Sequence, residues 1–128
     1  MRLAHATFVL CVGALSTACG DSSPRVLQSV VVTPAKADAQ NFPNGKVQFT
    51  PTGIFNRAPV RVTPLPMCSA PDATGACITA WSAFPPTVAA IDQNGTAQCV
   101  PGLSQTAKIE IALSGDGPLI TVAALTCP

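Results

Sequence analysis

Short runs in which apolar and polar residues alternate recur along the chain from residue 26 onward. The clearest run is Lys108–Leu113, in which Ile109, Ile111 and Leu113 alternate with charged or small residues. A period of two is typical of a β-strand that buries one of its faces. We therefore expect Ile109, Ile111 and Leu113 to lie in a hydrophobic core.

Seven other segments share this β character, because they are rich in β-branched residues or alternate in the same way. They are Val26–Thr33, Lys46–Phe55, Val60–Thr63, Ile78–Ser82, Thr87–Asp92, Thr96–Val100 and Leu119–Cys127. Pro34–Asn44 is expected to be a connection, and no helix is expected after residue 18. Pro51 interrupts its segment and indicates an edge position or a bulge. Asn94-Gly95 favours a tight hairpin turn with positive φ angles. The pattern predicts an all-β fold, a two-sheet antiparallel sandwich of seven or eight strands.

Trp81 is the only tryptophan of the chain. A lone exposed tryptophan can serve as a platform for a sugar ring, but such platforms usually contain several exposed aromatic residues. In a two-sheet sandwich a tryptophan on an inner strand commonly fills the core between the sheets. We therefore expect Trp81 in the core, beside the apolar residues of Lys108–Leu113.

Several of these segments together resemble a known family. They are L-Q-S-V-V-V-T-P at 27–34, G-K-V-Q-F at 45–49, Trp81-Ser82, Pro86–Asp92, Asn94-Gly95, Gly102 and A-K-I-E-I at 107–111. In order and spacing they resemble the bacterial immunoglobulin-like domain, group two, which is repeated in invasin- and intimin-type adhesins. The resemblance covers about residues 26–126 and implies an immunoglobulin-like sandwich without catalytic residues. The chain departs from the family in its cysteines, in a long insertion at 68–77 and in having one such domain.

The first 18 residues have the features of an export signal. Arg2 and His5 form a basic start, Ala6–Leu15 is apolar, and the small residues 16–18 follow. The apolar stretch is shorter than the roughly 20 residues that span a membrane. The chain is therefore predicted to be exported.

Ser16-Thr17-Ala18-Cys19 resembles the bacterial lipoprotein box, in which a lipid is attached to the cysteine thiol after cleavage before it. Ser16 stands where that box usually has a branched apolar residue. An ordinary secretory signal cleaved after Ala18 is the alternative. The resemblance implies a membrane anchor on Cys19, a polar tether over residues 19–25 and, since Gly20 follows the cysteine, a place at the outer membrane of the cell envelope.

The length and charge of the chain limit the number of domains and the kinds of partner that are expected. Of the 128 residues, the 110 that follow residue 18 suffice for one domain, 26–128. Without Arg2, six basic residues balance six acidic ones, so neither nucleic acid nor an anionic membrane surface is an expected partner.

Catalytic groups are scarce beyond the signal. The single histidine is His5, there is no tyrosine, and the only glutamate is Glu110. No nucleophile, phosphate-loop or zinc motif is present. We expect no enzyme, no cofactor and no metal. Asp92 and Asn94 beside Gly95 could suggest calcium, but turn formation explains these residue types without a metal.

Four cysteines remain beyond the signal and the lipid site: Cys68, Cys77, Cys99 and Cys127. An even number in an exported chain indicates disulfides, with three pairings open. We favour Cys68–Cys77, which flanks a loop rich in turn residues, and Cys99–Cys127, which would tie one strand to the last. Their spacing does not suit a four-thiolate zinc site.

The sequence thus predicts a non-enzymatic envelope lipoprotein that presents one domain for protein contact, adhesion or spacing. The alternative is a domain that binds a surface polysaccharide or a small ligand through the 68–77 loop, with help from residues 55–60. A loop closed by a disulfide loses little entropy on binding, which makes 68–77 the candidate contact surface.

Overall fold

The computed structural model describes residues 20, 23–71, 73, 75–115 and 118–128. The predicted export signal, Cys19 and the Asp116-Gly117 turn lie outside these residues. These described residues form ten strands: β1 (Leu27–Thr33), β2 (Lys36–Asp38), β3 (Lys46–Gln48), β4 (Thr50–Phe55), β5 (Arg61–Val62), β6 (Ile78–Phe84), β7 (Ala89–Ile91), β8 (Thr96–Cys99), β9 (Thr106–Leu113) and β10 (Ile120–Thr126). The only helices among the described residues are two 3-10 turns, η1 (Ala39–Asn41) and η2 (Pro43–Gly45). The all-β prediction is confirmed.

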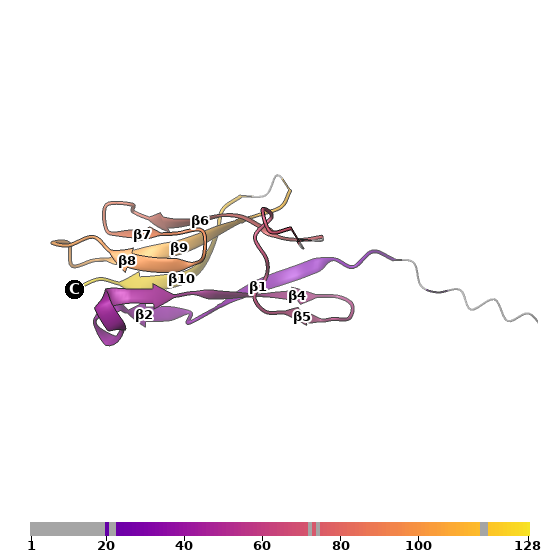
Figure 1. Cartoon of the computed structure of the whole chain (residues 1–128), viewed down its shortest axis with the longest axis horizontal. Helices are drawn as coiled ribbons and strands as arrows, with labels where there is room; N and C mark the ends of the chain where they lie inside the picture. The colour runs from indigo at the N-terminus through magenta and orange to yellow at the C-terminus, as the bar shows by residue number, and fades with distance from the viewer. Residues whose placement is uncertain (1–19, 21–22, 72, 74, 116–117) are drawn as a thin grey trace, which may run out of the picture.

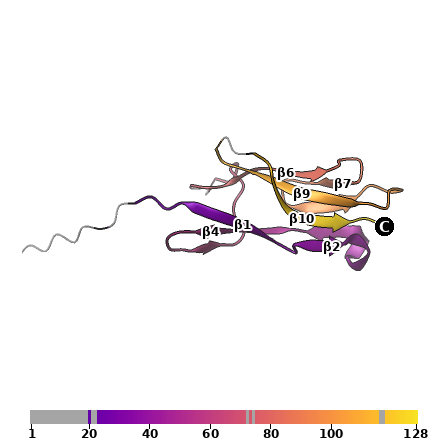
Figure 2. The ribbon, with the colours of Figure 1, turned by 180° about the vertical axis from the view of Figure 1, so that it is seen from behind.

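The strands form three sheets, with the orders β1-β4-β5, β2-β10-β9-β6 and β3-β8-β7. Figures 1 and 2 show them lying along the long axis of the molecule, with β6 and β9 on one side and β1, β4 and β5 on the other. All three sheets contribute to one core, with Val32 and Phe55 from the first, Ile109 and Leu125 from the second and Val47 from the third. Burial of this shared core is the main favourable contribution to folding.

β2 was not expected, since its three residues fall in the predicted connection 34–44. It pairs in parallel with β10, with Ala37 opposite Leu125, so the prediction of a purely antiparallel fold is wrong. Three residues are too short for an alternating pattern to be detected. The strand exists because Ala37 becomes buried against the last strand of the sheet.

The expected strand Lys46–Phe55 divides at Phe49 into two. β3 pairs with β8, whereas β4 pairs with β1, so one continuous run serves two sheets. Phe49 is fully buried at the division, and its N–H donates to the carbonyl of Gly95 at 2.8 Å. With β2, this division gives ten strands in the described part of the chain, where seven or eight were expected.

Pro51 lies within β4, opposite Val32 of β1. Its carbonyl accepts a hydrogen bond from Leu65 N–H at 2.8 Å, so its ring nitrogen faces the same side, away from β1. β5 pairs only with Gly53 and Ile54 and does not reach this level. Because no strand pairs with this side of Pro51, the missing N–H of the proline removes no hydrogen bond between strands. The position therefore behaves like the edge position that was predicted.

The predicted core residues lie in the core, with one difference. Trp81 is 5% exposed, and Ile109 and Ile111 are fully buried. Leu113 is only partly buried, because it is the last residue of β9 and pairs with Ile78, the first residue of β6. Trp81 therefore contributes to packing between the sheets.

The hairpin between β7 and β8 differs in detail from the prediction. Gly95 has a φ of +81°, but Asn94 does not have a positive φ. Asp92 N–H donates to the carbonyl of Thr96, and Gly95 N–H donates to the carbonyl of Asp92. Four residues, 92–95, therefore make the turn, and only the last takes the left-handed conformation that favours glycine.

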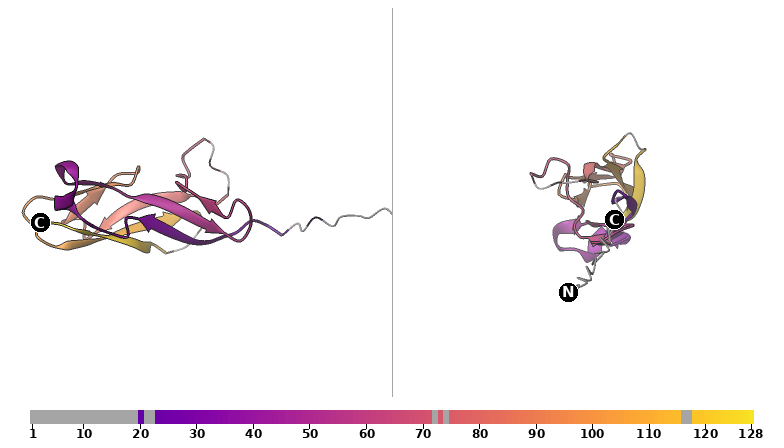
Figure 3. Two further views of the ribbon diagram at one scale, coloured as in Figure 1. Left: turned by 90° about the horizontal axis from the view of Figure 1, so that it is seen from below. Right: turned by 90° about the vertical axis from the view of Figure 1, so that its right-hand side faces the viewer.

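The chain enters the fold at one end of the long axis, and Pro128 lies near the other (Figures 1 and 3). We call the end where residues 23–26 join the fold the proximal end, and the other the distal end. The β4–β5 turn and the 68–77 loop lie toward the proximal end, whereas η1 and η2 lie at the distal end (Figure 1). The described part of the predicted contact loop and residues 23–26 thus lie toward the same end.

Candidate functional site

A shallow pocket of about 200 Å3 lies at the distal end. Eight residues line it: Ala39, Gln40, Phe42, Asn44, Gly45, Gln98, Cys99 and Pro128. They come from η1, η2, the end of β8 and the last residue of the chain. Asn44 and Gly45 have φ angles of +57° and +64°, which fold the chain tightly around one side of the pocket.

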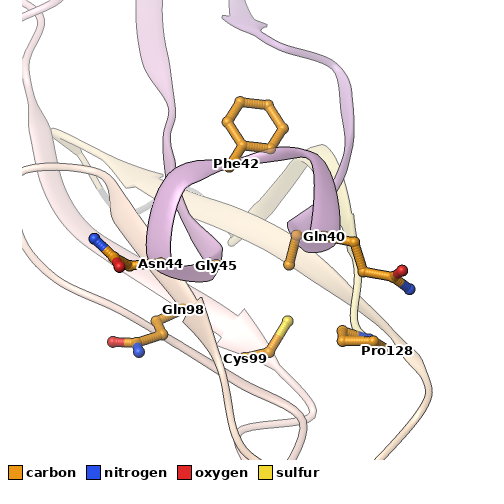
Figure 4. Close-up of a pocket in the computed structure, with 8 residues that line it drawn as sticks. Gln40, Phe42, Asn44, Gly45, Gln98, Cys99 and Pro128 are labelled. Atoms are coloured by element: carbon orange, nitrogen blue, oxygen red, sulfur yellow. The ribbon is translucent and has the colours of Figure 1, made fainter.

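Carboxamides are the main polar groups of this distal pocket. Figure 4 shows Asn44 and Gln98 on one side and Gln40 on the other, with the Phe42 ring directed away from the hollow. Within the described part of the chain, the side chains of Gln40, Asn44 and Gln98 make no hydrogen bond. Each carboxamide offers two donors and an acceptor, so the pocket suits a neutral ligand with hydroxyl or amide groups.

A second hollow of about 270 Å3 shares Gln98 with the distal pocket and adds Lys46 and Asp92. The Asp92 carboxylate accepts the N–H groups of Asn94 and Thr96, each at 2.9 Å, so it organises the β7–β8 turn. Thr96 in turn donates to the side chain of Gln48 at 2.8 Å. Asp92 therefore has the turn-forming role that its residue type suggested.

No cluster of three potential metal ligands occurs in the part of the chain that the structure describes. Asp92 has no second carboxylate beside it in either hollow. Both hollows can bind a ligand by hydrogen bonds and by contact with Ala90, Ile91 and Pro128, and Asp92 is the one acid among the residues that line them.

The two expected disulfides are present. Cys68 and Cys77 close the 68–77 loop, with a Cα–Cα distance of 4.9 Å. Cys99 and Cys127 join the end of β8 to the residue after β10, at 5.6 Å. Inside the loop, Ala70 N–H donates to Met67 and Ala73 N–H donates to Ala70, each through the backbone. These two bonds show that the described start of the loop makes turns, as its residue types suggested.

At the proximal end, Arg25 holds the chain against the β4–β5 turn. Its guanidinium lies 3.6 Å from the centre of the Phe55 ring and donates to the carbonyls of Arg57, at 3.3 Å, and Pro59. The next residue, Val26, exchanges hydrogen bonds with Asn56, at 2.8 Å through the side chain and 3.1 Å through the backbone. Arg25, the last residue of the tether expected over 19–25, therefore contacts the folded domain.

Replacing Arg25 by alanine should loosen this junction without unfolding the domain. The loss of the ring contact and of two hydrogen bonds at an exposed site is expected to cost about 1 kcal/mol. Hydrogen exchange should show faster exchange at residues 56–60, and calorimetry a fall in Tm of a few degrees. Arg61→Ala is the matched control, because the Arg61 side chain is exposed and has no hydrogen bond to a described residue. Equal effects of the two changes would contradict a specific role for Arg25.

Comparison of the sequence with protein-family models gave no match, and comparison with curated proteins gave none either. The resemblance to the group-two immunoglobulin-like domain therefore rests on the residues that carry it. Within the described residues, no helix is long and apolar enough to cross a membrane.

The residues of the distal pocket were not predicted as a site. Gln40 and Asn44 fall in the predicted connection, and Gln98 is one polar residue of an alternating strand. They meet because β3 pairs with β8, with Lys46 opposite Gln98. The one local signal in this region is the dipeptide Asn44-Gly45, which is typical of a turn and does not identify the segments that meet there.

Proposed function

We propose that the protein is a non-enzymatic envelope lipoprotein. In this proposal the domain is an immunoglobulin-like sandwich, held on the membrane through a lipid on Cys19, and its distal end makes the contacts with other envelope or surface molecules. The outer membrane is the proposed site of the anchor, on the lipoprotein resemblance of residues 16–20.

The grouping of strands supports the sandwich. β3 and β4 follow each other across Phe49, so the sheets β1-β4-β5 and β3-β8-β7 share one continuous segment. Together they form one layer, and β2-β10-β9-β6 forms the other. Trp81 of β6 packs between these layers, as a core tryptophan does in immunoglobulin-like domains.

The observation that carries the proposed function is the position of the two ends. The chain that would lead from Cys19 joins the fold at the proximal end, while the distal pocket, η1, η2 and Pro128 lie at the opposite end (Figures 1 and 3). An anchor on Cys19 would therefore present the distal end away from the membrane. A module that spaces or contacts other molecules needs this arrangement.

The test is the change Cys19→Ser in the full chain, expressed in a bacterial host that processes lipoproteins. We expect the native chain to carry a diacylglyceryl group on Cys19 by mass spectrometry and to remain with the membrane fraction. The variant should lose the lipid and move almost entirely to the soluble fraction, because the anchor supplies nearly all of the membrane affinity.

Protease treatment of intact and lysed cells then separates surface display from a periplasmic position. Cys11→Ser is the matched control, since it changes a cysteine within the predicted signal and should leave the anchor in place. An unmodified Cys19 in the native chain would contradict the lipoprotein proposal.

Ligand binding is the second candidate function, and the unpaired carboxamides of the distal pocket favour it. This moves the expected binding surface from the 68–77 loop to Gln40, Asn44 and Gln98. Under the anchored arrangement, the 68–77 loop lies toward the membrane and would be poorly placed for a surface polysaccharide. A glycan array is probed with the native chain, with the variant Asn44→Ala/Gln98→Ala and with a variant that lacks residues 69–76. The comparison shows whether binding depends on the distal pocket or on the 68–77 loop.

A further inference from the structure

We propose that Asn44, in η2 at the distal end, is a site of spontaneous deamidation, which converts a neutral side chain of the distal pocket into a carboxylate. The inference needs neither a lipid anchor nor a bound ligand, so it is independent of the proposed function. It rests on a comparison within the chain, which contains two Asn-Gly dipeptides, Asn44-Gly45 and Asn94-Gly95. The fold exposes the first dipeptide and holds the second in place.

An asparagine that precedes a glycine can lose its side-chain amide by closing a ring with the backbone. The glycine nitrogen, once hydroxide has taken its proton, attacks the side-chain Cγ of the asparagine. The N–Cγ bond forms as the Cγ–Nδ2 bond breaks, and the amide nitrogen takes a proton from water and leaves as ammonia. Water then opens the succinimide ring at either carbonyl, which gives aspartate or isoaspartate. Glycine favours the attack because no Cβ crowds its backbone nitrogen.

The backbone around Asn44 can make the movement that ring closure requires. Asn44 is exposed, and its side chain makes no hydrogen bond within the described part of the chain. Its φ and ψ are 57° and 20°, and it lies in a 3-10 turn of three residues that has no side-chain cap. Ring closure needs rotation about this ψ and release of the bond from Gly45 N–H to the Phe42 carbonyl, at 3.0 Å. A single exposed 3-10 turn opens at little cost in free energy.

The dipeptide Asn94-Gly95 is held by neighbouring strands. The carbonyl of Asn94 accepts from Gln48 Nε2 at 2.7 Å, and the carbonyl of Gly95 accepts from Phe49 N–H at 2.8 Å. Gly95 is buried, and a Cβ built on it would lie 2.6 Å from the carbonyl oxygen of Phe49. A Cβ built on Gly45 would have no such atom within 4 Å. Ring closure at Asn94 therefore requires the β7–β8 turn to separate from residues 48 and 49.

Deamidation would change both the charge and the shape of the distal pocket. The Asn44 carboxamide lies on the same side of the pocket as Gln98 (Figure 4). Its N–H donors would be replaced by a negatively charged acceptor. Isoaspartate would also lengthen the main chain by one methylene group between η2 and β3. A pocket that suits a neutral ligand would then favour a ligand that carries a positive charge.

The experiment incubates the purified full chain, with both disulfides formed, at neutral and at mildly alkaline pH. Mass spectrometry follows the replacement of NH2 by OH in tryptic peptides, and trypsin places the two asparagines in separate peptides, 37–46 and 62–108. Fragmentation of each peptide locates the modified residue. A sample digested before incubation corrects for deamidation during digestion, and a reduced sample in guanidinium chloride gives both rates without the fold.

In the folded chain we expect Asn44 to deamidate at least about tenfold faster than Asn94, because ring closure at Asn94 needs a larger opening of the structure. The rate at Asn44 should stay within about tenfold of its rate in the unfolded chain and should rise with pH. In the unfolded chain the two rates should agree to within about threefold, since both asparagines precede a glycine. Asn41, which precedes Phe42 in the same peptide, is the internal control and should remain unmodified. Asn44→Gln should abolish the change, because glutamine would have to close a larger ring.

Equal rates at Asn44 and Asn94 in the folded chain would overturn the proposal. A rate at Asn44 far below its rate in the unfolded chain would overturn it too, because the fold would then protect this dipeptide as well. Neither readout involves a lipid or a ligand, so failure here would leave the proposed function unaffected.

Discussion

Replacing Gly95 by alanine is expected to destabilise the domain more than any other single methyl addition at a described glycine. The φ of Gly95 is +81°, and a Cβ there would lie 2.6 Å from the carbonyl oxygen of Phe49 and 3.1 Å from the Trp81 ring. The left-handed conformation costs a residue other than glycine about 1–2 kcal/mol. The contact with Phe49 is with backbone, so relieving it requires β3, β4 or the β7–β8 turn to move.

The two costs together predict a loss of about 4 kcal/mol in the free energy of unfolding, a large part of the about 5–15 kcal/mol that a domain usually has. Thermal unfolding followed by circular dichroism should show a fall in Tm of about 20 °C. The hydrogen bond from Phe49 N–H to the Gly95 carbonyl, at 2.8 Å, should be lost as well. Hydrogen exchange at residue 49 reports this loss directly.

Gly102→Ala is the matched control. Gly102 also has a positive φ, +94°, but an added Cβ would have no atom within 4 Å. Only the conformational cost of about 1 kcal/mol is expected there. If Gly95→Ala and Gly102→Ala lowered the free energy of unfolding equally, the prediction would be wrong. The close approach of the β7–β8 turn to Phe49 and Trp81 would then not be the reason that glycine is needed at residue 95.

Local patterns predicted those parts of the fold that depend on one segment at a time. The alternation in Lys108–Leu113 identified β9 and its buried face, and the turn residues separated most of the strands. β2 was not predicted because a strand of three residues is too short to show an alternating pattern. Its partner β10 also lies far from it in the sequence, so no local pattern indicates the pairing. The division at Phe49 was missed because an alternating pattern does not reveal which strand pairs on each side.

The distal pocket could not be predicted from the sequence. Gln40, Asn44 and Gln98 come from segments that meet only through the pairing of β3 with β8.

Removing the Cys99–Cys127 disulfide is expected to cost more stability than removing Cys68–Cys77. The first bridge spans 28 residues and joins β8 of one sheet to the end of β10 in another. The second spans 9 residues and closes a loop at the proximal end. By loop entropy alone, the losses are about 3.6 and 2.7 kcal/mol.

The burial of Cys127 should further increase the stability lost on removing Cys99–Cys127, relative to removing Cys68–Cys77. Cys127 is 3% exposed and belongs to the core, and its N–H donates to the carbonyl of Gln105 at 2.8 Å. Cys99→Ala/Cys127→Ala therefore removes packing that the last residues of the chain need, in addition to the constraint on the unfolded chain. Cys68 is only partly buried, and its loop contributes little to the core beyond Cys77.

Urea unfolding of the two double-alanine variants measures the ranking. We expect Cys99→Ala/Cys127→Ala to lower the midpoint further and to increase hydrogen exchange at residues 96–99 and 120–126. Cys68→Ala/Cys77→Ala should increase exchange mainly at 66–78. A lower midpoint for the second variant would mean that the 68–77 loop, rather than the link between the sheets, limits unfolding, because loop length and burial both favour the opposite order.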